Sequence, residues 1–136
     1  MSEEHKPNNP NEKKRIEESG GQVTFTSEAW RINGSLSVAR SFGDINYHPY
    51  VTAEPEIKHL ELDGTEDYFI IGCDGLWETL NKNAMLDLVY EKRNEIGVNI
   101  SEILVRKALE NGSMDNITAI FVLLRDDLSQ IEKPIY

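Results

Sequence analysis

Two aspartates stand where apolar segments meet loops, and their chemistry can serve a metal site. Asp74 follows the apolar run 68–73, whereas Asp115 comes shortly before the apolar run 117–124. One carboxylate at the end of a buried strand and another at the start of a second strand can converge on one point in space. Converging carboxylates repel each other unless a cation or a proton lies between them. The pair therefore predicts part of a site for a hard divalent metal ion.

The segments around these aspartates predict two strands with two helices between them. The run 68–73 is apolar without alternation, which is typical of a strand that is covered on both faces. Helices are predicted over 81–94 and 101–110, because each carries an apolar stripe at helical spacing. The stripes consist of Ala84, Met85, Leu88, Val89 and Ile96 in the first helix and of Ile103, Leu104, Ala108 and Leu109 in the second.

The first half of the chain predicts shorter elements. A polar helix is expected over Asn8–Glu18, and short strands are expected over 22–26 and 30–32. Residues 51–62 alternate loosely and predict an extended segment, whereas residues 125–136 predict a loosely held polar tail. Strands followed by two helices and a last strand indicate an α+β layered domain. Few partner strands are available, so the chain is typical of part of a larger sheet system.

Composition narrows the classes of partner. The 136 residues include 24 acidic and 14 basic side chains, for a net charge of -10. Such a charge disfavours nucleic acid and anionic membranes as primary partners, and no apolar run approaches the ~20 residues that span a bilayer. The single cysteine, Cys73, cannot form an internal disulfide, which favours a reducing compartment, the cytosol or the nucleus.

Five segments taken together are more specific than any of them alone. They are Glu4-His5-Lys6-Pro7 with Arg15-Ile16 and Gly20-Gly21, then Asn33 to Asp44, Val51 to Glu56, Phe69 to Trp77, and Gly112 to Thr118. In this order and spacing they resemble the C-terminal half of the type 2C metal-dependent serine/threonine protein phosphatases. The resemblance covers residues 4–124, nearly the whole chain, and its strength lies in all five segments being in register.

The resemblance implies a fold, an activity and a cofactor. The fold would be the C-terminal part of a four-layer α-β-β-α sandwich, with a binuclear magnesium or manganese site between the sheets. Asp74 and Asp115 would be ligands of one of the two ions. The activity would be hydrolysis of phosphoserine and phosphothreonine in proteins by a metal-activated water, without a phosphoenzyme. Phosphoproteins would be the partners, and the complete protein would be a monomer.

The resemblance also shows which parts of such a site this chain does not carry. The family's other metal-binding aspartates, its phosphate-binding arginine and its general-acid histidine belong to upstream motifs that have no counterpart here. Glu4 replaces the family's aspartate, and His5 matches a position other than that of the general acid. Residues 1–124 are therefore interpreted as the C-terminal portion of a phosphatase domain, inactive alone. A non-catalytic phosphatase-like scaffold or binding module stays open, as does an unrelated small metal-binding domain.

Several further residues have expected roles near the site. Asn116 is expected to orient Asp115, and Gly75 to support the metal loop. The resemblance places Asp44 near the site, although a hydrogen bond or ion pair with Arg40 explains it equally well.

The flap of the family corresponds to the region of about residues 5–35. Within it, Trp30 and Arg31 could dock a phosphopeptide, or they could be ordinary surface residues of a hairpin. Near the metal loop, Leu76 and Trp77 are expected to pack in the core and Cys73 to be a small buried hydrophobe.

Overall fold

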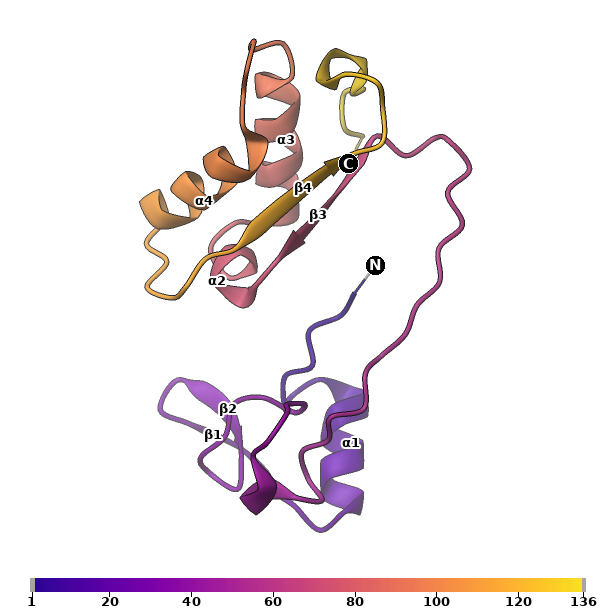
Figure 1. Cartoon of the computed structure of the whole chain (residues 1–136). Coiled ribbons are helices and arrows are strands. Elements are labelled where there is room, and N and C mark those ends of the chain that lie inside the picture. The colour runs from indigo at the N-terminus through magenta and orange to yellow at the C-terminus, as the bar shows by residue number, and fades with distance from the viewer. Residues whose placement is uncertain (1, 136) are drawn as a thin grey trace. The chain divides into compact units, whose positions relative to one another are not determined.

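The structure, a computed structural model, describes residues 2–135 and divides the chain into two compact units. The first unit extends to Leu60, and the second begins at Glu61. Helices and strands occur in both units, which confirms the mixed α+β class (Figure 1). Within residues 2–135, none of the helices has the length and apolar character needed to cross a bilayer.

The first unit combines one helix with a β-hairpin. Helix α1 spans Pro10–Glu18, strands β1 and β2 span Val23–Thr26 and Ala29–Ile32, and a 3-10 turn, η1, spans Ile45–Tyr47. The Asn9 side chain caps α1 by accepting a hydrogen bond from the Asn11 amide. The strands pair antiparallel, and the prediction of a helix followed by two short strands is confirmed. The core of this unit is formed by Ile16, Ile32, Ala39 and Val51.

The second unit places helices against one face of a two-stranded sheet. Strands β3, Tyr68–Gly72, and β4, Ala119–Leu123, pair antiparallel in the register Tyr68↔Leu123. Between them come α2, Asp74–Trp77, α3, Lys82–Lys92, and α4, Ile100–Glu110, and a 3-10 turn η2, Leu128–Gln130, follows β4 (Figure 1). Asparagine side chains begin both longer helices, because Asn81 accepts from the Ala84 amide and Asn99 from the Glu102 amide.

The core of the second unit lies between these helices and one face of the sheet. Its buried members are Leu76, Leu80, Met85, Val89, Ile100, Leu104, Ala108 and Ile131. Ile96 and Leu109, which the helical stripes included, are exposed instead. Ile96 lies beyond the end of α3, so the helical period no longer applies to it.

Among the described residues, 51–62 contain neither helix nor strand, and their one ladder contact is the bridge between Arg40 and Thr52. The expectation that the strand over 68–73 is covered on both faces is wrong for the residues described. The β3 strand is covered on one face only, since Ile71 and its partner Ile120 are 54% and 50% exposed on the other. Within residues 61–135, the described part of the second unit, β3 and β4 form the only sheet.

The expectation of a loosely held tail is also wrong over its first part. Ile131 is 4% exposed in the core of the second unit. The Arg125 guanidinium donates to the Asp67 carboxylate at 2.7 Å and to the carbonyls of Gly64 and Thr65. Ile131 and Arg125 therefore fix the first part of the tail, although its residues are mostly polar.

Candidate functional site

The structure places Asp74 and Asp115 on two loops that lie side by side. Asp74 is the first residue of α2, directly after β3 and Cys73, and Asp115 belongs to the loop between α4 and β4. The Cys73 amide donates to the carbonyl of Thr118 at 3.3 Å. The Cys73 thiol donates to the Asn116 carbonyl at 3.0 Å and accepts from the Thr118 amide at 3.2 Å. These bonds join the end of β3 to the segment that leads into β4.

Gly75 shows how closely the two loops approach. A Cβ atom added to this buried glycine would lie 2.4 Å from the Asn116 carbonyl oxygen and 3.3 Å from the Cβ of Asp115. The first figure is far below van der Waals contact, so a side chain at position 75 would separate the loops. The structure therefore brings together four residues expected from the sequence, Asp74, Gly75, Asp115 and Asn116.

Both carboxylates are exposed and are oriented by their own backbones. The Asp74 Oδ1 accepts from the Gly75 amide at 3.0 Å, and the Asp115 Oδ1 accepts from the Asn116 amide at 2.6 Å. A wide hollow of about 620 Å³ borders Asp115 and is lined also by Glu78, Thr79 and residues 112–114.

These residues fit a divalent metal as part of a donor set. Carboxylate oxygens in contact with solvent suit Mg²⁺, which takes hard oxygen ligands and keeps several waters. Residues 2–135 contain no group of three or more His, Cys, Asp or Glu side chains that could hold an ion. A full coordination shell would therefore need oxygen donors beyond this pair, and the role of the pair as ligands stays a prediction.

Comparison with known proteins identifies the family. The family model described as Protein phosphatase 2C matches residues 1–117. The chain belongs to the protein phosphatase 2C family. Protein phosphatase 1E of Mus musculus is 44% identical over 125 residues, which cover 90% of this chain and 17% of that protein. Protein phosphatase 1F of Rattus norvegicus is 39% identical over 135 residues, which cover 97% of this chain and 30% of that protein.

Solved structures agree with this membership. A sex-determining protein of C. elegans has a TM-score of 0.85 and 29% identity, covering 92% of this chain and 32% of that one. A phosphatase from Toxoplasma gondii has a TM-score of 0.78 and 28% identity, covering 90% of this chain and 40% of that one. The chain thus spans less than a third of the length of the two phosphatase relatives above.

Asp44 and Arg31, which the family resemblance associates with the site, belong to the first unit. Asp44 has a left-handed backbone, with φ at 45°, and accepts a hydrogen bond from the Ser41 hydroxyl at 2.5 Å. The alternative partner considered for it, Arg40, binds Glu12 instead. Arg31 donates to the Ser35 carbonyl at 2.6 Å. The supporting role of Asp44 and the substrate-binding role of Arg31 in this phosphatase 2C chain stay predictions.

The hairpin expected to be the flap presents two aromatic rings. Trp30 is 38% exposed and packs edge-on against Phe25, with the ring centroids 5.4 Å apart. The Lys13 ammonium lies 5.9 Å from the Trp30 ring centroid. This geometry agrees with a hairpin that has exposed side chains, and it leaves phosphopeptide docking and an ordinary surface both open.

Around the metal loop the packing expectations are confirmed for one residue and corrected for two. Leu76 is fully buried. Trp77 is 44% exposed, and its indole N–H donates to the Gly72 carbonyl at 2.7 Å, so it serves the loop by a hydrogen bond. Cys73 is half-buried and acts through its thiol hydrogen bonds rather than as an inert hydrophobe.

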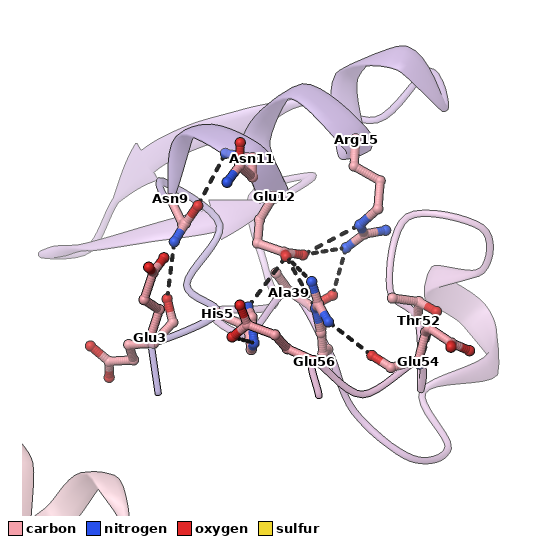
Figure 2. A network of polar contacts seen from close by, with 12 residues as sticks. Glu3, His5, Asn9, Asn11, Glu12, Arg15, Ala39, Thr52, Glu54 and Glu56 are labelled. Atoms are coloured by element: carbon pink, nitrogen blue, oxygen red, sulfur yellow. Dashed lines mark hydrogen bonds and ion pairs between the residues drawn. The ribbon is translucent and has the colours of Figure 1, made fainter. Parts of the chain in front are cut away.

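The sequence reasoning missed a buried polar network around Glu12 (Figure 2). Glu12 is 2% exposed and accepts hydrogen bonds from Arg15 Nη2 at 2.9 Å and Arg40 Nε at 3.0 Å. His5 Nδ1 lies 3.3 Å from the same carboxylate, and His5 Nε2 lies 3.4 Å from Glu56. Burial opposes ionisation, but hydrogen bonds from Arg40 and Arg15 outweigh it and lower the pKa of the Glu12 carboxyl.

A signal for this network exists in the sequence. Glu12 lies one helical turn before Ile16, on the face that α1 buries. The spacing of Asn9 and Glu12 is also that of a capping box, which would place the glutamate at the exposed start of the helix. The structure shows Glu12 turned inward, where it joins the N-terminal segment to α1 and to residue 40.

Proposed function

We propose that this chain supplies the C-terminal part of the active site of a metal-dependent phosphatase that hydrolyses phosphoserine and phosphothreonine in proteins. Membership of the protein phosphatase 2C family supports the reaction class. One observation carries the proposal for the residues: Gly75 packs against Asp115 and Asn116, so the loops that bear the two carboxylates adjoin. Such an arrangement suits shared oxygen ligation of Mg²⁺ or Mn²⁺.

Asp74 and Asp115 would hold one ion of a binuclear centre. When bound, the metal supplies positive charge for the phosphoryl oxygens and lowers the pKa of a water molecule. The chain's own contribution is orientation. The Gly75 amide donates to one oxygen of Asp74, and the Asn116 amide donates to one oxygen of Asp115. These bonds restrict rotation of each carboxylate and so fix the direction of its second oxygen.

The outer face of the β3–β4 sheet supports a four-layer arrangement. Ile71 and Ile120 are half-exposed there, opposite the face that packs on the helices. Sheets with two apolar faces are stable when layers cover both. We propose that a second sheet, from the portion of the relatives that precedes the matched region, covers this face and brings the remaining metal ligands.

The decisive test removes each carboxylate in a protein extended upstream to the span of its relatives. Asp74→Asn and Asp115→Asn should each lower hydrolysis of a phosphothreonine peptide by about 100-fold, measured with added MnCl₂. Asp126→Asn, a matched change at an exposed aspartate outside the site, should retain wild-type rates. Wild-type turnover in either site variant would refute the assignment, as would metal-dependent turnover by residues 1–136 alone.

A non-catalytic phosphatase-like scaffold is the second candidate, because the described residues supply only part of a metal site. The presence of both Asp74 and Asp115 argues against loss of ligands in this half and leaves the upstream half open. Assays of the extended protein distinguish the phosphatase from the scaffold, because a scaffold would bind phosphoproteins but would not hydrolyse them with any added metal ion. For either function we propose phosphoprotein partners rather than nucleic acid, a monomer, and a cytosolic or nuclear setting.

A further inference from the structure

We propose that Ser113 is a positioning residue that fixes the loop of Asp115 against α2, and so sets the distance between the two metal-binding carboxylates. This inference rests on the proposed function, because it concerns how Asp74 and Asp115 come to face one ion. Ser113 lies between the end of α4 and Asp115. Its role follows from its backbone, its side chain and the freedom of its neighbour.

The backbone of Ser113 is fixed by the way α4 ends. The Gly112 amide donates to the Leu109 carbonyl at 2.9 Å, and the Ser113 amide donates to the Ala108 carbonyl at 3.0 Å. Gly112 has φ at 91°, in the left-handed region. This pair of bonds around a left-handed glycine is the Schellman ending of a helix. Ser113 is therefore held at a defined place relative to α4, which packs in the core through Ile100, Leu104 and Ala108.

The side chain of Ser113 carries this rigidity to α2. Its hydroxyl donates to the Gly75 carbonyl at 2.9 Å. Gly75 directly follows Asp74 and packs against Asp115, so the bond joins the segment after α4 to a residue that adjoins both aspartates. Asn111 makes a second tie between the same segments, because its side-chain amide donates to the Thr79 carbonyl at 2.9 Å.

Between Ser113 and Asp115 the loop is open to solvent. Met114, the residue between Ser113 and Asp115, is 99% exposed. On the other side, Asn116 is held by the Cys73 thiol. Asp115 thus lies between Ser113 and Asn116, each of which is fixed by a hydrogen bond. Loss of the Ser113 hydroxyl would remove the bond on one side. The carboxylate would then sample more positions, and an ion shared with Asp74 would bind less tightly.

The chain offers a matched control for this bond. The Thr79 hydroxyl also donates to the Gly75 carbonyl, at 3.2 Å. Thr79 follows α2 itself, so its bond stays within one segment and does not cross to the loop of Asp115. Thr79→Val and Ser113→Ala each remove one hydroxyl from the same acceptor, but only the second releases the loop.

The experiment uses Mn²⁺ as a paramagnetic probe of the ¹⁵N-labelled 136-residue chain. In the wild type, the amides of Asp74, Gly75, Asp115 and Asn116 should broaden together at lower Mn²⁺ concentration than those of other acidic segments. Ser113→Ala should raise the concentration for half-broadening by about threefold to tenfold. Ser113→Thr, which keeps the hydroxyl, and Thr79→Val should remain within about twofold of the wild type.

Each outcome decides a separate claim. Unselective broadening in the wild type would overturn Mn²⁺ binding by the Asp74 and Asp115 pair in this chain, and the positioning role with it. Selective broadening that Ser113→Ala leaves unchanged, or that Thr79→Val weakens equally, would overturn the positioning role alone. Amide shifts of α3 and α4 report whether a variant keeps its fold. If Ser113→Ala does not, Ser113→Val is compared with Ser113→Thr, which has the same shape, and equal Mn²⁺ binding by these two would overturn the role.

Discussion

At the scale of residues, Gly75 and Glu12 each fix one local arrangement: Gly75 the approach of the two acidic loops, and Glu12 the buried polar network of the first unit. Gly75 is required because the Asn116 carbonyl occupies the space of a side chain. Glu12 is buried, and a buried carboxylate must be compensated by hydrogen-bonded cations, which Arg15 and Arg40 supply. The first residue sets the approach of the two acidic loops. The second holds together the N-terminal segment, α1 and the segment around Arg40 (Figure 2).

Replacing Glu12 by glutamine should destabilise the first unit by about 2–4 kcal/mol at pH 7, because Arg15 and Arg40 lose the charge that compensates them. Unfolding in urea can be followed by Trp30 fluorescence in a Trp77→Phe background, since Trp30 belongs to the first unit. Glu17→Gln, which neutralises an exposed glutamate of the same helix, should change stability by less than about 0.5 kcal/mol. Equal effects of the two substitutions would contradict the buried role.

The same carboxylate gives the first unit a pH dependence. The pKa of Glu12 is lower in the folded chain than its ordinary value, so the ionised form favours folding. Its contribution is fully present above the unfolded pKa of about 4.3 and is lost as the pH falls through the lower folded value. The difference in stability between the wild type and Glu12→Gln should therefore shrink below about pH 4. A difference that stays constant to pH 3 would show that the charge is not what matters.

At the scale of elements, the helices could be predicted because local signals agree with the tertiary environment. Asn9, Asn81 and Asn99 cap α1, α3 and α4, and the apolar period of α4 matches its buried face through Leu104 and Ala108. The sequence indicated only that Asp74 and Asp115 could converge, and the pairing of the strands beside them brings their loops together. Local signals carry no information about partners distant in sequence, and there the predictions failed.

The expectation of a loosely held tail failed most clearly, because one apolar residue among polar ones is buried and fixes the position of the segment. Ile131 lies in the core of the second unit, whereas Ile135 is 98% exposed. Residues 51–62 alternate loosely, but among the described residues their one ladder contact is the bridge from Thr52 to Arg40. The inward turn of Glu12 was unpredictable from its cap-like spacing, because Arg40 is its partner from 28 positions away.

Ile131→Ala should destabilise the second unit by about 2–4 kcal/mol, through lost burial and the cavity that remains. Ile135→Ala removes the same atoms from an exposed position and should change stability by less than about 0.5 kcal/mol. Thermal or urea unfolding followed by Trp77 fluorescence in a Trp30→Phe background reports on this unit. A tail that is loosely held would make the two substitutions equivalent.

At the scale of the whole molecule, the chain carries an apolar surface that a small independent domain would normally cover. Ile71 and Ile120 face outward as a cross-strand pair of β3 and β4. The chain also spans only 17% and 30% of the length of protein phosphatases 1E and 1F from mouse and rat. Together these facts support an assembly in which the sheet has a partner, and in which the carboxylates beside it have further ligands.

This assembly predicts that one substitution has different effects in two contexts. Ile120→Lys should change the stability of the 136-residue chain by less than about 1 kcal/mol, because the side chain is half-exposed there. In a protein extended upstream to the span of its relatives, the same lysine would be buried without a partner and should cost several kcal/mol. Ile96→Lys, at a fully exposed position away from the sheet, should be tolerated in both. Urea unfolding of six proteins makes the comparison: the wild type, Ile120→Lys and Ile96→Lys, each as the 136-residue chain and as the extended protein. An equal cost of Ile120→Lys in both contexts would mean that nothing covers the sheet.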